Sequence, residues 1–89
     1  MPRTEHKDYN KFHKKILYDM YYDRSIWGRH TSIDNVIKGF RKSDKGDAKD
    51  AVKDLLRLNL IIPKNTSEGM HVSLNHDLIK EIEKIIRDV

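Results

Sequence analysis

Basic side chains recur at a regular interval in the middle of the chain, and they are the residues best suited to bind a ligand. Lys49, Lys53 and Arg57 are four positions apart, so in a helix they would share one face. Like charges at this spacing repel by roughly a few tenths of a kcal/mol, a cost that a bound anion would offset. Arg41 and Lys42 lie just upstream. The pattern therefore indicates a phosphate-binding face, with a solvated basic face that binds nothing as the alternative.

Histidine is the other residue type that could support chemistry here, as a metal ligand. The five histidines are His6, His13, His30, His71 and His76. No two of them are four residues apart in a predicted helix, and the chain has no cysteine, so we expect no metal site and no cofactor. Neither a glycine-rich phosphate loop nor a Ser/His/Asp arrangement is recognisable, and Asp50 and Asp54 share a solvated helix face. We therefore expect a protein that is not an enzyme.

Size and composition narrow the class of protein further. A chain of 89 residues is long enough for one domain with one core and too short for a deep substrate cleft. The absence of cysteine excludes a disulfide framework, and no apolar run approaches the roughly 20 residues of a membrane span. Residues 1–10 are charged and lack a secretory signal, so we expect a cytoplasmic protein without a membrane partner. The net charge of +4 resides in residues 1–44, which favours acidic partners.

The first elements that would position these side chains are predicted from apolar periodicity. Residues 1–8 are polar and are expected to form a disordered tail ahead of a domain at 9–89. Apolar residues at steps of three and four predict a helix at about Tyr9–Tyr22. The connection that follows is centred on Trp27, which we expect to anchor the core, and a very short strand is predicted at 29–31.

Two further helices are predicted in the middle of the chain. Thr31 or Ser32 suits the N-cap of a helix of about seven residues that stops near Gly39. Residues 41–46 are polar and are predicted to form a turn, from which Ser43 or Asp44 would cap the third helix. That third helix, at about 45–58, carries the basic row on its outer face.

A hairpin and a last helix complete the predicted order. Residues 60–62 are β-prone and end at a proline, 64–69 are polar, and 70–74 alternate apolar with polar side chains. We therefore predict a two-stranded β-hairpin at about 60–74 with a loop of about six residues. Asn75 would cap the C-terminal helix, whose apolar stripe is wide. Its members are Leu78, Ile79, Ile82, Ile85, Ile86 and Val89.

This order of elements resembles the winged helix-turn-helix, an α+β, mostly α fold with a three-helix core, a hairpin wing and a C-terminal helix. The resemblance covers about residues 9–87. Its most specific part is KGDAKDAVKDLLRLNLIIPKNTSEGMHVSLN, at 45–75, which is similar to stretches of small archaeal winged-helix proteins of unassigned function. No catalytic motif accompanies the match, so it bears on fold more strongly than on function.

The resemblance implies that the third helix enters the major groove of double-stranded DNA and that the wing touches the backbone or minor groove. The residues it assigns to DNA binding are Ser32, Arg41, Lys42, Lys45, Lys49, Lys53, Lys64, Asn65 and Thr66. The third helix offers lysine rather than arginine near its start, and lysine recognises phosphate better than the edge of guanine. We therefore expect a small transcriptional regulator whose single domain binds DNA modestly, with strong salt dependence and weak sequence specificity.

Alternatives to the DNA-binding function, and the oligomeric state, remain open at this point. A winged helix can also serve as a protein-interaction module, and its working surface would then be apolar, around Tyr21, Tyr22 or Ile79. RNA binding is less favoured because no exposed aromatic platform is evident. One row of the C-terminal stripe suffices for the core, so the other could pack on a second copy in a homodimer. No pocket for a small-molecule ligand is evident from the sequence.

Overall fold

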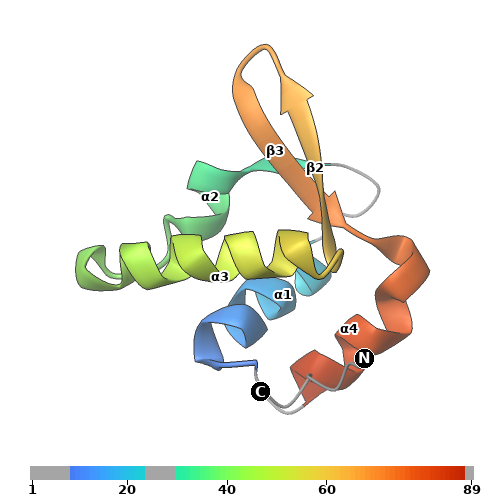
Figure 1. The fold of residues 1–89 in the computed structure, drawn as a ribbon. Coiled ribbons are helices and arrows are strands. Elements are labelled where there is room, and N and C mark those ends of the chain that lie inside the picture. The colour runs from blue at the N-terminus through green and yellow to red at the C-terminus, as the bar shows by residue number, and fades with distance from the viewer. Residues whose placement is uncertain (1–8, 24–29, 88–89) are drawn as a thin grey trace.

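The computed structural model describes residues 9–23 and 30–87, and within them it has four α-helices and a three-stranded antiparallel sheet (Figure 1). The predicted tail at 1–8 and Trp27 lie outside the described residues. The predicted class, α+β and mostly α, is confirmed. In chain order, the elements are α1 (Lys11–Tyr22), β1 (Thr31–Ser32), α2 (Ile33–Ile37), the 3-10 helix η2 (Lys42–Asp44), α3 (Lys45–Arg57), β2 (Ile61–Thr66), β3 (Gly69–Leu74), the 3-10 helix η3 (His76–Leu78) and α4 (Ile79–Arg87).

The N-terminal helix begins two residues later than predicted because Asn10 caps it. The Asn10 side chain accepts hydrogen bonds from the backbone N–H groups of Phe12 (2.9 Å) and His13 (3.1 Å). In return, the backbone N–H of Asn10 donates to Nδ1 of His13 at 3.0 Å. This reciprocal pair is a capping box in which histidine takes the place usually held by glutamate or glutamine. It satisfies two donors at the helix start and fixes the His13 ring.

The second helix and the segment after it differ from the prediction. Ser32 caps α2 as expected, since its hydroxyl oxygen accepts from the Asn35 N–H at 3.0 Å. The helix ends at Ile37, before Gly39, because the Phe40 N–H donates to the Ile37 carbonyl and so tightens the last turn. Segment 41–46 is not an open turn, because η2 runs directly into α3.

The expected side-chain cap of α3 was wrong. The side chain of Asp44, at the N-cap position, makes no capping hydrogen bond and accepts from Nε of Arg41 at 3.4 Å. Because η2 already has helical backbone geometry, α3 continues from it without the extended N-cap residue that a side-chain cap requires. The bounds of α3 itself agree with the predicted 45–58 to within one residue.

The predicted hairpin is confirmed, but its loop is shorter than expected. Strands β2 and β3 pair from Ile61 with Leu74 to Thr66 with Gly69, which leaves a two-residue turn at 67–68 instead of six loop residues. Pro63 does not end β2, because the strand order β1-β3-β2 places β2 at the edge. An edge strand tolerates proline, since the missing N–H belongs on its unpaired side.

The step from α3 into the hairpin is a Schellman motif. Asn59 takes the left-handed conformation, with φ at 64°. Its N–H donates to the Leu56 carbonyl, and the Leu60 N–H donates to the Leu55 carbonyl, both at 3.0 Å. After the hairpin, the side-chain amide of Asn75 donates to the Asn59 carbonyl at 2.7 Å, and the Asn75 N–H donates to the Leu60 carbonyl. The two ends of the hairpin are therefore tied to each other at its base.

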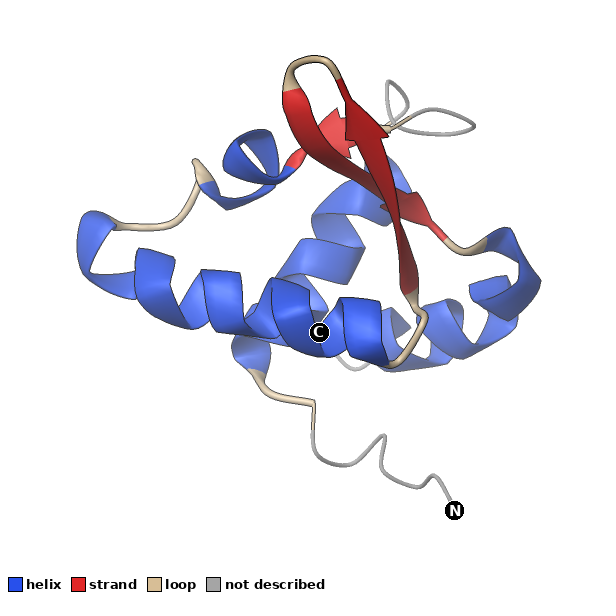
Figure 2. Cartoon of the chain, turned by 45° about the horizontal axis from the view of Figure 1, so that its top comes forward, coloured by secondary structure: helices blue, strands red, loops and turns tan. Residues whose placement is uncertain are grey.

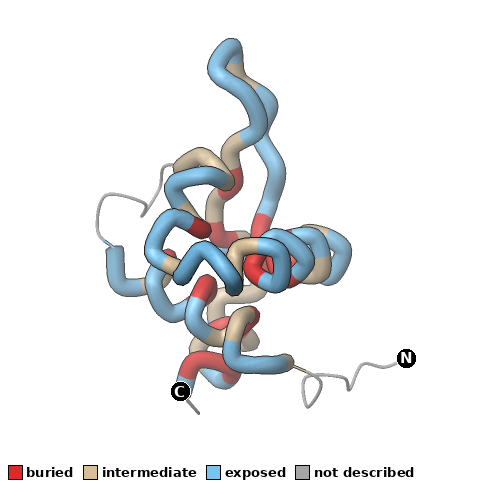
Figure 3. The backbone as a smooth tube through the Cα atoms, turned by 90° about the vertical axis from the view of Figure 1, so that its left-hand side faces the viewer, coloured by how far each residue is buried: buried red, intermediate tan, exposed pale blue. Residues whose placement is uncertain are grey.

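The core lies between the helices and the base of the hairpin, while the upper part of the hairpin projects from the body (Figures 2 and 3). Helix α1 is central to it and contacts α2, α3, α4 and β3. The buried apolar side chains are Ile16, Leu17, Met20, Ile37, Ala48, Ala51, Val52, Leu55, Leu60, Ile61, Val72, Leu74, Ile82, Ile85 and Ile86. In the described part of the chain, no helix is both long and apolar enough to cross a membrane.

Candidate nucleic-acid interface

The three lysines of α3 lie on a flank of the helix away from α1. Lys49 and Lys53 are exposed and Lys45 is half-buried, while Ala48, Ala51, Val52 and Leu55 of the same helix face the core. Asp54 marks the flank of α3 that faces α1, because it contacts His13. Successive helical residues are about 100° apart, so Lys53 and Lys49 project on the other side of the helix from this contact. The three lysines thus form one row, which we call the lysine row (Lys45, Lys49 and Lys53).

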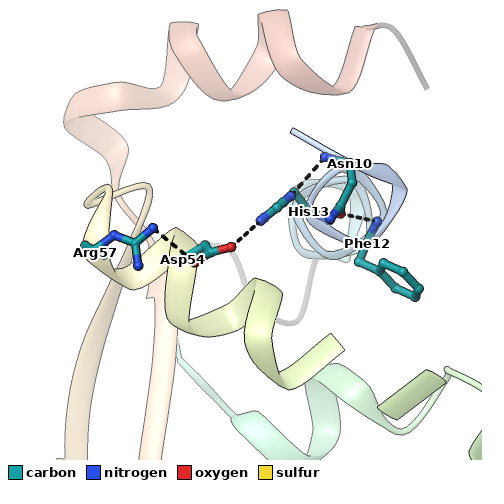
Figure 4. A network of polar contacts seen from close by, with 5 residues as sticks. All are labelled: Asn10, Phe12, His13, Asp54 and Arg57. Carbon is teal, nitrogen blue, oxygen red and sulfur yellow. Dashed lines mark hydrogen bonds and ion pairs between the residues drawn. The ribbon is translucent and has the colours of Figure 1, made fainter. Parts of the chain in front are cut away.

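No carboxylate holds the lysine row in an ion pair among the described residues. Of the two aspartates beside it, Asp54 is engaged elsewhere: Nε2 of His13 lies 3.0 Å from its Oδ2, and Arg57 lies 3.1 Å from its Oδ1 (Figure 4). Asp50 is exposed on the outer face of the helix. The positive charge of the row is therefore left available for an external anion.

The contact between His13 and Asp54 was not foreseen from the sequence. His13 is only 6% exposed, and it is the one buried polar residue in the described part of the chain. Because Nδ1 of His13 accepts a hydrogen bond from the Asn10 N–H, the ring proton is on Nε2. The Nε2–H group therefore donates a hydrogen bond to the Asp54 carboxylate. The pattern Asn-x-x-His at a helix start was an available signal for the cap, but nothing in the sequence connects residues 41 positions apart.

Three of the residues predicted to bind DNA, Arg41, Lys42 and Ser32, precede α3. Arg41 is 83% exposed at its side chain and pairs weakly with Asp44 at 3.4 Å, and Lys42 is exposed. Both directly precede the lysine row. Ser32 is half-buried and its hydroxyl is engaged as the α2 cap. Arg41 and Lys42 are therefore exposed basic residues just before α3, whereas the Ser32 hydroxyl is occupied by its capping bond.

The hairpin residues assigned to DNA binding do not share one surface. Lys64 pairs across the sheet with His71, while the core-facing residue Val72 pairs with Pro63. Since side chains alternate along a strand, Lys64 lies on the face turned away from the core, and Asn65 lies on the other face. The Thr66 hydroxyl donates to the Gly69 carbonyl at 2.8 Å and so closes the turn. Lys64 and Asn65 therefore project from opposite faces of the hairpin.

Two histidines meet on the outer face of the sheet, a contact that the sequence analysis missed. Nδ1 of His30 lies 2.6 Å from Nδ1 of His71, so one ring donates and the other accepts. A hollow of about 390 Å³ beside them is lined by Lys64 and His76 among others. In the described residues, no group of three or more His, Cys, Asp or Glu side chains is placed to hold a metal ion.

The surface considered for protein docking carries exposed tyrosines. The rings of Tyr18 and Tyr22, both on α1, have centroids 4.6 Å apart and planes inclined by 46°, and Tyr22 is 61% exposed. The Tyr21 hydroxyl donates to the Glu83 carboxylate at 2.6 Å, which raises the pKa of Tyr21 above its ordinary value of 10.0; burial of the ring and the charge of Glu83 act in the same direction. This bond joins α1 to α4.

Most of the C-terminal apolar stripe is used within one copy of the chain. Ile82, Ile85 and Ile86 are buried in the core, with exposed fractions of 7% or less. Leu78 and Ile79 are half-buried and pack against the same core. Val89 lies outside the described residues, and among the described members of the stripe a homodimer would rest on the remaining exposed parts of Leu78 and Ile79.

Comparison with known protein families, with curated proteins and with solved structures found no match.

Proposed function

We propose that the protein is a winged-helix module that binds double-stranded DNA through the lysine row of α3, as a small transcriptional regulator. The observation that carries the proposal is the lysine row itself, with three ammonium groups on one helix flank and no carboxylate partner among the described residues. The order of three helices, hairpin and C-terminal helix supports the winged-helix assignment.

The dimensions of α3 suit the major groove. An α-helix with its side chains is about 10–12 Å across, and the groove is about 12 Å wide. Lysines along one flank would contact phosphates at the groove edge, whereas Arg41 lines the hollow beside α1 and lies apart from this row. Asn65, near the hairpin tip, would reach the neighbouring backbone. Lys64, on the opposite face of the hairpin, contributes little in this arrangement.

This mode of binding depends mainly on charge. Lysine offers a flexible point charge, whereas recognition of guanine favours the two-pronged arginine side chain. Arg57, at the end of α3, is engaged with Asp54. The proposed complex is therefore held by phosphate contacts and discriminates weakly among sequences.

Titration of a random-sequence duplex at several salt concentrations tests the proposal. With roughly five phosphate contacts, the logarithm of the binding constant should fall with the logarithm of salt concentration with a slope of about −4 to −6. Replacing the lysine row by alanine should reduce that slope by about two to three units. A matched control replaces Lys80, Lys84 and Arg87, which are exposed on α4, and removes the same charge.

The outcomes of this titration separate the candidate functions. If the control weakens binding as much as the lysine-row variant does, the duplex responds to net charge and not to α3. If the wild type does not bind even at low salt, the DNA proposal fails. A protein-interaction module would then be the better assignment, because Tyr18 and Tyr22 present adjacent aromatic rings to solvent.

A further inference from the structure

A groove of about 860 Å³ lies between α1 and residues 39–44. Its aromatic lining comes from Phe12 and Tyr18 of α1 and from Phe40. The Phe12 and Phe40 rings have centroids 5.8 Å apart and planes inclined by 39°, and Tyr18 is 41% exposed. These two phenylalanines are 28 positions apart in the chain, and only the fold brings them together, so the sequence alone did not indicate an exposed aromatic platform.

Basic side chains surround these rings. Lys11 and Lys14 line the groove without a carboxylate partner among the described residues. Lys15 and Arg41 also line it and are paired, Lys15 with Asp19 at 3.1 Å and Arg41 with Asp44 at 3.4 Å. After these pairs are counted, the groove retains a net positive charge from its two free lysines.

The charges and the rings are close enough to act on one ligand. Nζ of Lys11 lies 5.4 Å from the centre of the Phe12 ring, and Nζ of Lys15 lies 5.6 Å from that of Phe40. A ring surface bordered by ammonium groups suits a flat aromatic group that carries an anion, since stacking and ion pairing can then occur together. Neither a plain hydrocarbon nor a bare anion would use both features.

We propose that this groove binds a nucleotide, with the base against the aromatic rings and the phosphate held by Lys11 and Lys14. Base stacking on aromatic side chains beside basic groups is a general means of binding nucleotides without regard to sequence. The nucleotide could be free or part of an unpaired strand, and both present the same base and phosphate. The site does not depend on DNA binding by the lysine row, because Lys45, Lys49 and Lys53 do not line the groove.

Binding of AMP to the full chain, followed by NMR and calorimetry, tests the proposal. We expect AMP to bind at least about tenfold more tightly than adenosine or inorganic phosphate, since each of these lacks one half of the interaction. Gly39 lines the groove and Gly69 lies at the hairpin tip, so the Gly39 amide signal should move on addition of AMP while that of Gly69 stays in place.

Charge-reversal variants locate the phosphate. Replacing Lys11 and Lys14 by glutamate should weaken AMP binding by about tenfold or more, while the matched change of Lys80 and Lys84 on α4 should leave it unchanged. Phe40→Leu keeps an apolar side chain at the half-buried position but removes the ring. It should weaken AMP by about tenfold and leave phosphate binding unaltered.

Two further measurements show whether the nucleotide is free or part of a strand, and whether the groove and the lysine row are separate sites. A short oligo-dA that displaces AMP at lower nucleotide concentration points to an unpaired strand, and equal potency points to the free nucleotide. The site is refuted if no saturable binding occurs at about 10 mM AMP, or if the lysine-row alanine variant loses AMP binding. Loss of duplex binding in that variant, with AMP binding retained, would support both proposals as separate surfaces.

Discussion

Removing the Asp54 carboxylate should destabilise the fold, because it leaves the buried His13 ring without an acceptor. The His13 side chain is 7% exposed, so water cannot readily replace Asp54, which is itself 36% exposed. A hydrogen bond to a charged group contributes about 1.5–3 kcal/mol, and an unsatisfied buried donor costs about 1–3 kcal/mol. Since Asp54 is partly solvated, we expect Asp54→Ala to lower the free energy of unfolding by about 1–2 kcal/mol.

Thermal and urea denaturation measure this loss. For a domain of this size, 1 kcal/mol corresponds to about 4–8 °C in Tm, so Asp54→Ala should melt roughly 4–16 °C lower. Asp54→Asn retains a carbonyl oxygen that can accept from Nε2 and should lose less. Arg57 is the other partner of Asp54, and its side chain is 72% exposed. Arg57→Ala should therefore lower the free energy of unfolding by less than about 1 kcal/mol.

Asp50→Ala is the matched control, since Asp50 is an exposed aspartate of the same helix without an ion pair in the described structure. If Asp54→Ala and Asp50→Ala have equal stability, the contact with His13 contributes nothing. The reasoning about buried donors would then be wrong for this site. A double-mutant cycle that pairs Asp54→Ala with His13→Ala isolates the coupling between the two side chains.

Two further predictions concern Tyr21 and Asn59. The pKa of Tyr21 is raised by its bond to Glu83, so its contribution to stability is fully present below about pH 10 and is lost as pH rises through the folded-state pKa. The stability difference between the wild type and Tyr21→Phe in urea should therefore stay constant up to about pH 9 and shrink as the pH rises above about 10, and a difference that stays constant above pH 10 would contradict the bond. Asn59 has φ at 64°, so Asn59→Ala should cost about 1 kcal/mol in thermal denaturation while Asn59→Gly should be near neutral; equal losses would contradict the strain argument.

The local features of this fold could be predicted from the sequence, because they depend on neighbouring residues. Apolar spacing located α1, α3 and the two hairpin strands, and the caps Ser32 and Asn75 followed from side chains that accept from nearby N–H groups. Pro63 led to a predicted loop that was too long, since the effect of a proline on a strand depends on whether that strand lies at the edge of the sheet. Strand order is a property of the whole sheet and has no local signal.

The candidate sites depended more strongly on contacts between distant segments. Helical spacing alone predicted a basic row of Lys49, Lys53 and Arg57, but Arg57 is engaged with Asp54, and Lys45 was assigned only through the winged-helix resemblance. The face on which Lys64 lies could have been found by counting alternate residues from Ile61, which is buried. In contrast, the groove joins Phe12 to Phe40, and the His30–His71 contact joins the residue before β1 to β3, so both require the tertiary fold.

The tie at the base of the hairpin gives the protein a rigid lever. Six residues per strand span about 20 Å, so a tilt of about 10° at the base would displace the tip by about 3 Å. This displacement of the tip is comparable to the length of a hydrogen bond, so it would be enough to break a contact made there. The bonds from Asn75 to Asn59 and Leu60 restrain that tilt where it begins. Substitutions or insertions at turn residues 67 and 68 should consequently change the length of the hairpin without changing its angle to the body, because that angle is fixed by the hydrogen bonds at its base.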